Sequence, residues 1–137
     1  TCFGEPFMVR HPAEYAELLG EKIRTHDAQC WLINTGLTGG PYGTGTRINL
    51  THTRAMVDAI LTDELNGVPT TPDRVFGMHV PEHVPNVPDT VLQPRTTWDD
   101  PDAFDQQAAE LARMFAENFA KYADHVSAGV EAAAPTA

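Results

Sequence analysis

One glycine-rich stretch decides how this chain folds, and over residues 34–48 it reads NTGLTGGPYGTGTRI. Five of the ten residues 36–45 are glycine, so the backbone there reaches left-handed conformations freely and cannot form a helix. The apolar run Cys30–Asn34 before it suits a strand buried on both faces, and Thr46–Leu50 after it suits a return strand. The stretch therefore predicts a glycine loop between two short strands.

Three other segments carry apolar residues at helical spacing. The first opens at His11-Pro12, with proline at the first helical position, and should end near residues 26–27. The second should start at Thr53 and be capped by Asn66-Gly67. The third should begin in the acidic run 99–102, where the helix dipole favours negative charge, and continue for about six turns.

The expected fold is mixed α/β, with short strands and three main helices. Prolines exclude a central helix between residues 68 and 94, leaving room for a short strand at Val75–Val80. We expect one domain over residues 1–125 and a frayed, alanine-rich tail over 126–137. The expected buried faces of the three helices are apolar: Tyr15, Leu18, Leu19 and Ile23; Met56, Val57, Ile60, Leu61 and Leu65; Phe104, Leu111, Met114, Phe115, Phe119 and Tyr122.

The length, the net charge and the distribution of apolar residues exclude several classes of protein. The 137 residues suit one compact domain, and a net charge of −10 disfavours a surface for nucleic acid or anionic membrane. Hydrophobic residues make up 42% of the chain, yet no apolar run approaches the ~20 residues that span a bilayer. We therefore expect a soluble domain. The N-terminus, which lacks an initiator methionine, reads like the middle of a protein, although removal of methionine before a small residue would also explain it.

The two cysteines indicate neither a disulfide scaffold nor a zinc site. Cys2 and Cys30 could form at most one bridge, and Cys30 lies in an apolar run typical of a small buried side chain. A reducing cytosol is the expected compartment. His79 and His83 are four residues apart, but Pro81 prevents a helix from aligning them as metal ligands.

The glycine loop is the segment best suited to a ligand. Residues 40–45 have the glycine spacing of a phosphate-binding Walker A loop, but Thr46-Arg47 follow where that motif needs lysine and then serine or threonine. Pro41 also removes one backbone donor. A flexible or substrate-adjacent loop is therefore favoured over a phosphate cradle.

Two residues after the loop have both a structural and a functional interpretation. Arg47 is either an exposed strand residue paired to a carboxylate, or a guanidinium that stacks on a purine or holds an anion. Thr53 is either a helix N-cap or a hydroxyl offered to a ligand. No Ser-His-Asp or Cys-His pattern is present, so the residues alone indicate a ligand-binding loop without catalytic machinery.

The block from Asn34 to Ile48, followed by Thr53-Arg54-Ala55, resembles the C-terminal part of the ATP-dependent phosphoenolpyruvate carboxykinases. Leu37 stands where that family usually has tryptophan. The resemblance covers almost the whole chain in order, through the motifs Cys2-Phe3-Gly4-x-Pro6-Phe7, His11-Pro12, Tyr15-Ala16-Glu17, Phe76-Gly77, Val80-Pro81, Pro85-x-Val87-Pro88, Pro94-Arg95-x-Thr97-Trp98 and Phe115-x-Glu117-Asn118-Phe119.

The resemblance implies a cytoplasmic enzyme of gluconeogenesis that converts oxaloacetate and ATP to phosphoenolpyruvate, CO₂ and ADP, assisted by Mg²⁺ and Mn²⁺. It also implies that Arg47, Ile48 and Thr53 bind the nucleotide near its adenine and ribose. The family's phosphate loop, metal ligands and oxaloacetate-binding arginine match no residue here, so they are expected outside this chain.

We therefore expect roughly the last quarter of a carboxykinase, inactive alone, that forms the adenine and ribose side of the ATP site. Two alternatives stay open: a stand-alone, non-catalytic module that binds a nucleotide or a protein, and a structural remnant that binds nothing.

Overall fold

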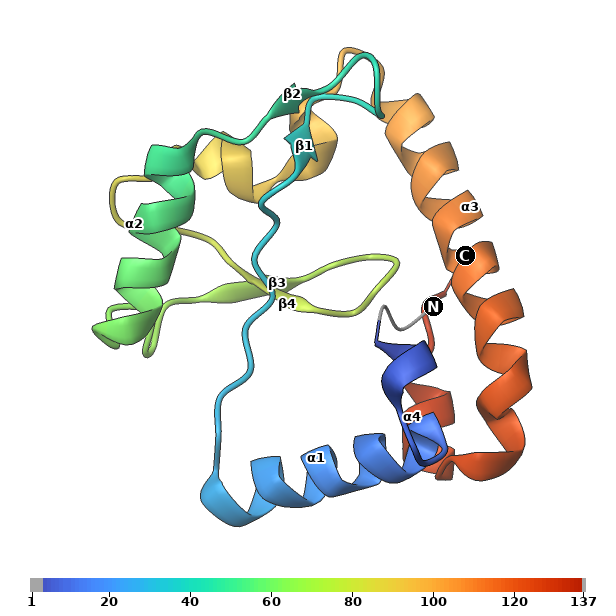
Figure 1. Ribbon diagram of the computed structural model, residues 1–137. Coiled ribbons are helices and arrows are strands. Elements are labelled where there is room, and N and C mark those ends of the chain that lie inside the picture. The colour runs from blue at the N-terminus through green and yellow to red at the C-terminus, as the bar shows by residue number, and fades with distance from the viewer. Residues whose placement is uncertain (1–3, 137) are drawn as a thin grey trace. The chain divides into compact units, whose positions relative to one another are not determined.

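The computed structural model describes residues 4–136 and has the expected mixed α/β character (Figure 1). Among these residues, four α-helices accompany two two-stranded antiparallel sheets. The elements are η1 (Glu5–Phe7), α1 (Pro12–His26), β1 (Leu37–Thr38), β2 (Thr46–Arg47), α2 (Leu50–Leu61), β3 (Thr70–Pro72), β4 (His79–Pro81), η2 (Asp89–Leu92), η3 (Pro94–Thr97), α3 (Pro101–Phe119), η4 (Ala120–His125) and α4 (Ala128–Ala132), where η marks a 3₁₀ helix.

The chain forms two compact units. One contains the described residues up to Leu32 together with Met114–Ala134, and the other contains Ile33–Arg113 with the last described residues. The glycine loop, both sheets and α2 belong to the second unit. The sequence-based division into residues 1–125 and a tail stays a prediction. No helix of the described part is long and apolar enough to cross a membrane.

Helix α1 has the predicted bounds because both of its ends carry local signals. Pro12 occupies the first helical position, and the ring Nδ1 of His11 accepts a hydrogen bond from the Ala13 N–H at 3.3 Å. At the other end Asp27 adopts a left-handed conformation with φ 48°, and its N–H donates to the Ile23 carbonyl. The expected buried face is wrong, however, since Leu18 is 51% exposed.

The strand predicted at Cys30–Asn34 does not form. Residues 28–35 have no regular structure, Cys30 is exposed, and Leu32 is 83% exposed. A strand needs a neighbour to satisfy its backbone groups, and none of the described strands pairs with this run. The expectation of a buried cysteine is therefore also wrong, while Cys2 lies outside the described residues.

Helix α2 begins earlier and ends earlier than predicted. Asn49 is its N-cap, with the side-chain oxygen accepting the Thr51 N–H at 2.9 Å, so Thr53 is not the cap. Turns follow the helix after Leu61, and Gly67, with φ 80°, lies beyond its end. Ala59 is the buried residue of the helix, whereas Leu61, expected in the core, is 76% exposed.

The proline-rich segment contains the hairpin β3–β4, with Thr71 opposite Val80. The strand predicted at Val75–Val80 is wrong in position, because Val75 lies in a turn where the Asp73 carboxylate accepts its N–H at 3.0 Å. The real strand starts at His79.

Helix α3 starts as predicted and packs differently from the prediction. The Asp100 carboxylate accepts the N–H groups of Asp102 at 2.9 Å and Ala103 at 3.3 Å. Its buried residues are the small Ala108 and Ala112. The stripe expected to pack in the core is instead partly exposed, with Met114 and Phe115 each 52% exposed, and Leu111 40% exposed. After it, the tail predicted to be frayed contains the short helix α4.

Within residues 4–136 the buried apolar side chains are few and mostly of modest size: Ile48, Ala59, Leu65, Val84, Val87, Ala108 and Ala112. Several large apolar side chains on α1 and α3 are left in contact with water. Exposed large apolar side chains such as these favour association.

We predict that the isolated chain self-associates. Light scattering at rising protein concentration should show an increasing mean mass, and Leu19→Glu should lower it, because Leu19 is 62% exposed on α1. Thr25→Glu, on an exposed polar position of the same helix, is the control and should leave association unchanged. A monodisperse monomer at all concentrations would contradict this prediction.

Candidate functional site

The glycine loop connects the two strands of a very short hairpin (Figure 1). Strand β1 pairs antiparallel with β2 through two residue pairs, Leu37 with Arg47 and Thr38 with Thr46. The loop between them spans residues 39–45. Two pairs supply little stability of their own, because an isolated two-stranded hairpin is marginal in water.

The loop closes on itself through one carbonyl. The Pro41 oxygen accepts the Thr44 N–H at 3.0 Å and the Gly45 N–H at 2.8 Å. A side chain at Gly45 would collide with the Gly40 carbonyl, and Gly43 has φ 94°. The loop therefore needs glycine at these points for steric reasons.

This closure makes the loop a poor phosphate cradle. A Walker A loop directs its N–H groups at the phosphates and leads into a helix. Here the amides of Thr44 and Gly45 are turned inward, Pro41 has none, and the strand β2 follows. The geometry agrees with the sequence-based argument against a phosphate cradle, and a ligand-adjacent loop stays a prediction.

Asn34 fixes the base of the hairpin. Its Oδ1 accepts the Gly36 N–H at 2.8 Å, and its Nδ2 donates to the Leu37 carbonyl at 3.2 Å. The Gly36 carbonyl in turn accepts the Ile48 N–H at 2.9 Å. The Asn34 side chain thus holds the backbone at the start of β1. Through Gly36 it also holds the backbone just after the end of β2.

Thr97, from η3, holds the other end of β1. Its Oγ1 lies 3.1 Å from the Gly39 nitrogen, 3.1 Å from the Thr38 Oγ1 and 2.7 Å from the Pro94 carbonyl. Figure 1 shows the yellow-orange segment that contains η3 beside β1. The hairpin is therefore supported by a residue almost sixty positions away in sequence.

Helix η3 is itself attached to α3. The Arg95 guanidinium donates from Nε and Nη2 to the two carboxylate oxygens of Asp105, both at 2.9 Å. This hydrogen-bonded pair lowers the pKa of Asp105 and raises that of Arg95. Beside it, the rings of Trp98 and Phe104 meet edge to face with centroids 5.5 Å apart.

The three residues predicted to bind a nucleotide lie along one connection, from β2 into α2. Arg47 ends β2 and is exposed, and within residues 4–136 no carboxylate partner is found for its guanidinium. Ile48 is 9% exposed, so its side chain packs in the core. Thr53 is half-buried in the first turns of α2, and its N–H donates to the Asn49 carbonyl at 3.2 Å.

The second unit also has an open cavity of about 390 Å³ that does not include these three residues. Arg54 and Asp58 of α2 and its C-cap Thr62 line it, together with Pro85 and Asn86. At 100° per residue, Thr53 faces away from that side of the helix. The predicted nucleotide residues and the cavity are thus separate features.

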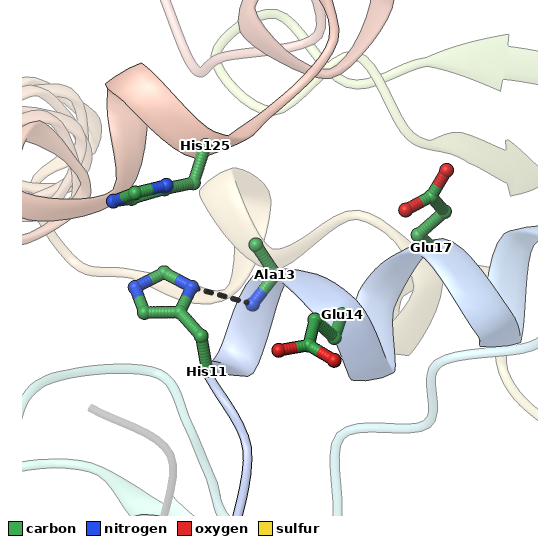
Figure 2. Close-up of a pocket in the computed structure, with 5 residues that line it drawn as sticks. All are labelled: His11, Ala13, Glu14, Glu17 and His125. Carbon is green, nitrogen blue, oxygen red and sulfur yellow. Dashed lines mark hydrogen bonds between the residues drawn. The ribbon is translucent and has the colours of Figure 1, made fainter.

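A cavity of about 330 Å³ in the first unit gathers two histidines and two glutamates (Figure 2). His11 and His125 have ring centroids 4.3 Å apart, and Glu14 and Glu17 complete the lining with Ala13. Glu14 is paired with Arg10 at 3.0 Å.

No group of three or more histidine, cysteine or acidic side chains in the described part of the chain is placed to hold a metal ion. His79 and His83 make separate contacts, with Thr70 and Asp89 respectively. The described residues therefore do not fit a metal centre.

Comparison with known proteins matches the chain to one family. A family model described as phosphoenolpyruvate carboxykinase matches residues 1–90. The chain is 62% identical, over 99% of its length, to phosphoenolpyruvate carboxykinase (ATP) 1 of Salinibacter ruber. The chain belongs to the phosphoenolpyruvate carboxykinase family. It is also 53% identical, over 96% of its length, to phosphoenolpyruvate carboxykinase (ATP) of Geobacillus kaustophilus.

The chain spans about a quarter of the length of these carboxykinases, 25% in both cases. Both relatives are named as the ATP form of phosphoenolpyruvate carboxykinase. The resemblance to the carboxykinases inferred from residues 34–55 is confirmed at the level of the family.

Sequence reasoning missed the side chains that hold the carboxykinase hairpin in place. Asn34 and Thr97 both stand in motifs that carry the family resemblance, so the signal was present. Their roles depend on contacts to backbone groups, and for Thr97 on a partner far away in sequence, which spacing does not reveal.

We predict that the link between η3 and α3 weakens in acid. Because Arg95 lowers the pKa of Asp105 below its ordinary value of 3.8, the stability it gives is full above that value. It is lost as the pH falls through the lower pKa of the folded state. Thermal melts should therefore show Asp105→Asn less stable than the original chain at pH 7, with the difference shrinking in strong acid.

Asp124→Asn is the matched control for this charge change, since Asp124 is exposed on η4. It should leave the melting temperature unchanged. An Asp105→Asn deficit that is equal at neutral and acidic pH would show that the ion pair is not its cause.

Proposed function

We propose that this chain forms the adenine and ribose side of the ATP site of a phosphoenolpyruvate carboxykinase. The whole enzyme would convert oxaloacetate and ATP to phosphoenolpyruvate, CO₂ and ADP. The proposal is carried by family membership together with one structural feature, a hairpin braced on both sides that leaves the Arg47 guanidinium exposed.

The proposed roles follow from the chemistry of each residue. The Arg47 guanidinium is planar and always charged, so it can stack on a purine ring or hold an anionic group. The Thr53 hydroxyl is free of the capping role, which Asn49 performs, and can hydrogen-bond a ribose. Because the Ile48 side chain is buried, Ile48 would contact the nucleotide only through its main-chain atoms. Its packing in the core would also hold the neighbouring Arg47 in position.

In the proposed reaction, oxaloacetate loses CO₂ and the electrons of the broken C–C bond form an enolate. The enolate oxygen then attacks the γ-phosphorus of ATP, and ADP leaves. This chain's residues would orient the nucleotide, so that the γ-phosphate meets the enolate in line. They would bind the base equally in the ground and transition states.

The other components of the proposal lie outside this chain. The described residues form no metal centre, so the ligands of Mg²⁺ and Mn²⁺, the phosphate loop and the oxaloacetate site are proposed for the remaining polypeptide. A gluconeogenic role and a cytoplasmic location are proposed on the family resemblance alone.

The proposal is tested in a hybrid enzyme in which this chain replaces its matching quarter of the Salinibacter ruber relative, with which it is 62% identical. Steady-state kinetics should show that Arg47→Ala raises KM for ATP by roughly tenfold, as expected for a lost contact to a charged group. KM for oxaloacetate and kcat should change little, because the contact is equally strong throughout the reaction.

Arg24→Ala is the matched control, since Arg24 is an exposed arginine on α1, in the other unit. It should leave KM for ATP unchanged. If Arg47→Ala has no more effect than the control, Arg47 does not bind the nucleotide, and the chain's place in the ATP site is wrong.

A further inference from the structure

We propose that Thr97 is a positioning residue of the nucleotide site, acting through the glycine loop on Arg47. The inference rests on the proposed function and extends it to a residue that would not touch the nucleotide. It is based on a hydroxyl that makes three hydrogen bonds, two of which join η3 to the end of β1 while the third stays within η3.

The direction of each hydrogen bond follows from counting protons. A threonine hydroxyl has one proton to donate and two lone pairs. The Pro94 carbonyl can only accept, so the Thr97 proton goes there, at 2.7 Å. The Gly39 N–H must then donate to Thr97, and the Thr38 hydroxyl must donate as well, each at 3.1 Å. All three positions on Thr97 Oγ1 are filled.

The loop depends on this contact because its internal hydrogen bonds to the Pro41 carbonyl shape the loop without attaching it to the rest of the fold. Gly39 adopts φ 75°, a conformation that leaves a glycine backbone many alternatives. A Cβ on Gly39 would lie 3.3 Å from the Thr97 carbonyl, so the two backbones are already close. Without the hydroxyl, the partly buried Gly39 N–H and Thr38 hydroxyl would lose their partner on η3.

The register of the hairpin transmits this position to Arg47. Thr38 pairs with Thr46, and the preceding Leu37 pairs with Arg47 itself. These two pairs are the whole ladder, so a shift of β1 moves the residue opposite it. By holding β1 in place, Thr97 therefore also sets the position of Arg47, which pairs with β1.

Thr97 can act as a fixed point because η3 is secured on its far side. Arg95 forms two parallel hydrogen bonds to Asp105 on α3, and Trp98 packs edge to face on Phe104. A two-pronged guanidinium–carboxylate contact restricts rotation as well as distance. The hairpin thus takes its position from α3 by way of η3.

This role predicts a particular kinetic change. A displaced Arg47 loses contact with the nucleotide in the ground state and the transition state alike, which raises KM for ATP and leaves kcat nearly unchanged. A general loss of folded enzyme would instead lower kcat with KM unchanged. The two effects can be separated by measurement.

Thr97→Val in the hybrid enzyme keeps the shape of the side chain and removes the hydroxyl. We expect KM for ATP to rise roughly three- to tenfold, the range for one or two lost hydrogen bonds. Values of kcat and of KM for oxaloacetate should stay within about twofold, because neither depends on this contact. Thr97→Ser, which restores the hydroxyl, should restore KM.

Thr96→Val is the matched control. Thr96 is the neighbouring residue of η3, and its hydroxyl makes the same kind of bond, to the Gln93 carbonyl at 2.8 Å, without reaching the loop. It should leave KM for ATP unchanged. If Thr97→Val folds poorly, Thr38→Val tests the same link, since it removes one bond and leaves the Thr97–Pro94 bond intact; it should raise KM for ATP by about threefold.

The outcomes separate this inference from the proposed function. If Arg47→Ala raises KM for ATP while Thr97→Val and Thr38→Val match the Thr96→Val control, Thr97 is not a positioning residue and the proposed function stands. A fall in kcat at constant KM for Thr97→Val, or no rescue by Thr97→Ser, also overturns the inference. If Arg47→Ala itself leaves KM for ATP unchanged, the proposed function fails.

Discussion

The hydroxyl of Thr97 is the contact on which the arrangement of the glycine loop depends. The loop consists largely of residues without side chains, and its hairpin has two residue pairs, so almost nothing inside it fixes its position. Fixing such a backbone costs conformational entropy that internal contacts do not offset. Thr97 on one side and Asn34 on the other supply the missing contacts through side-chain hydrogen bonds.

This support shows how a glycine-rich segment would serve the proposed nucleotide site without binding phosphate itself. The loop directs its amides of Thr44 and Gly45 at its own Pro41 carbonyl, which leaves them unavailable to an anion. The loop instead leads into β2, which ends at the exposed Arg47 and is held in place by its contacts to the rest of the fold. The proposed division of work within the carboxykinase follows: this chain orients the base, and other polypeptide performs the chemistry.

Local signals made part of the fold predictable from sequence. Pro12 and the acidic start of α3 act on their own helices, and both predictions are confirmed. The start of α2 was also within reach, because Asn49 is a preferred N-cap residue. The exposure of Cys30 and Leu32 was not, because burial depends on partners elsewhere in the fold. Arg47 was found by resemblance, whereas the role of Thr97 required a contact across the fold.

Hydrogen exchange tests the central claim most directly, that the segment from Asn34 to Thr53 forms a wall of the ATP site. In the hybrid enzyme, the amides of this segment are followed with and without saturating ATP, with segment 12–26 of α1 as internal reference. The account predicts slower exchange in residues 34–53 when ATP binds and no change in the reference. Unchanged exchange throughout residues 34–53, in an enzyme that demonstrably binds ATP, would contradict it.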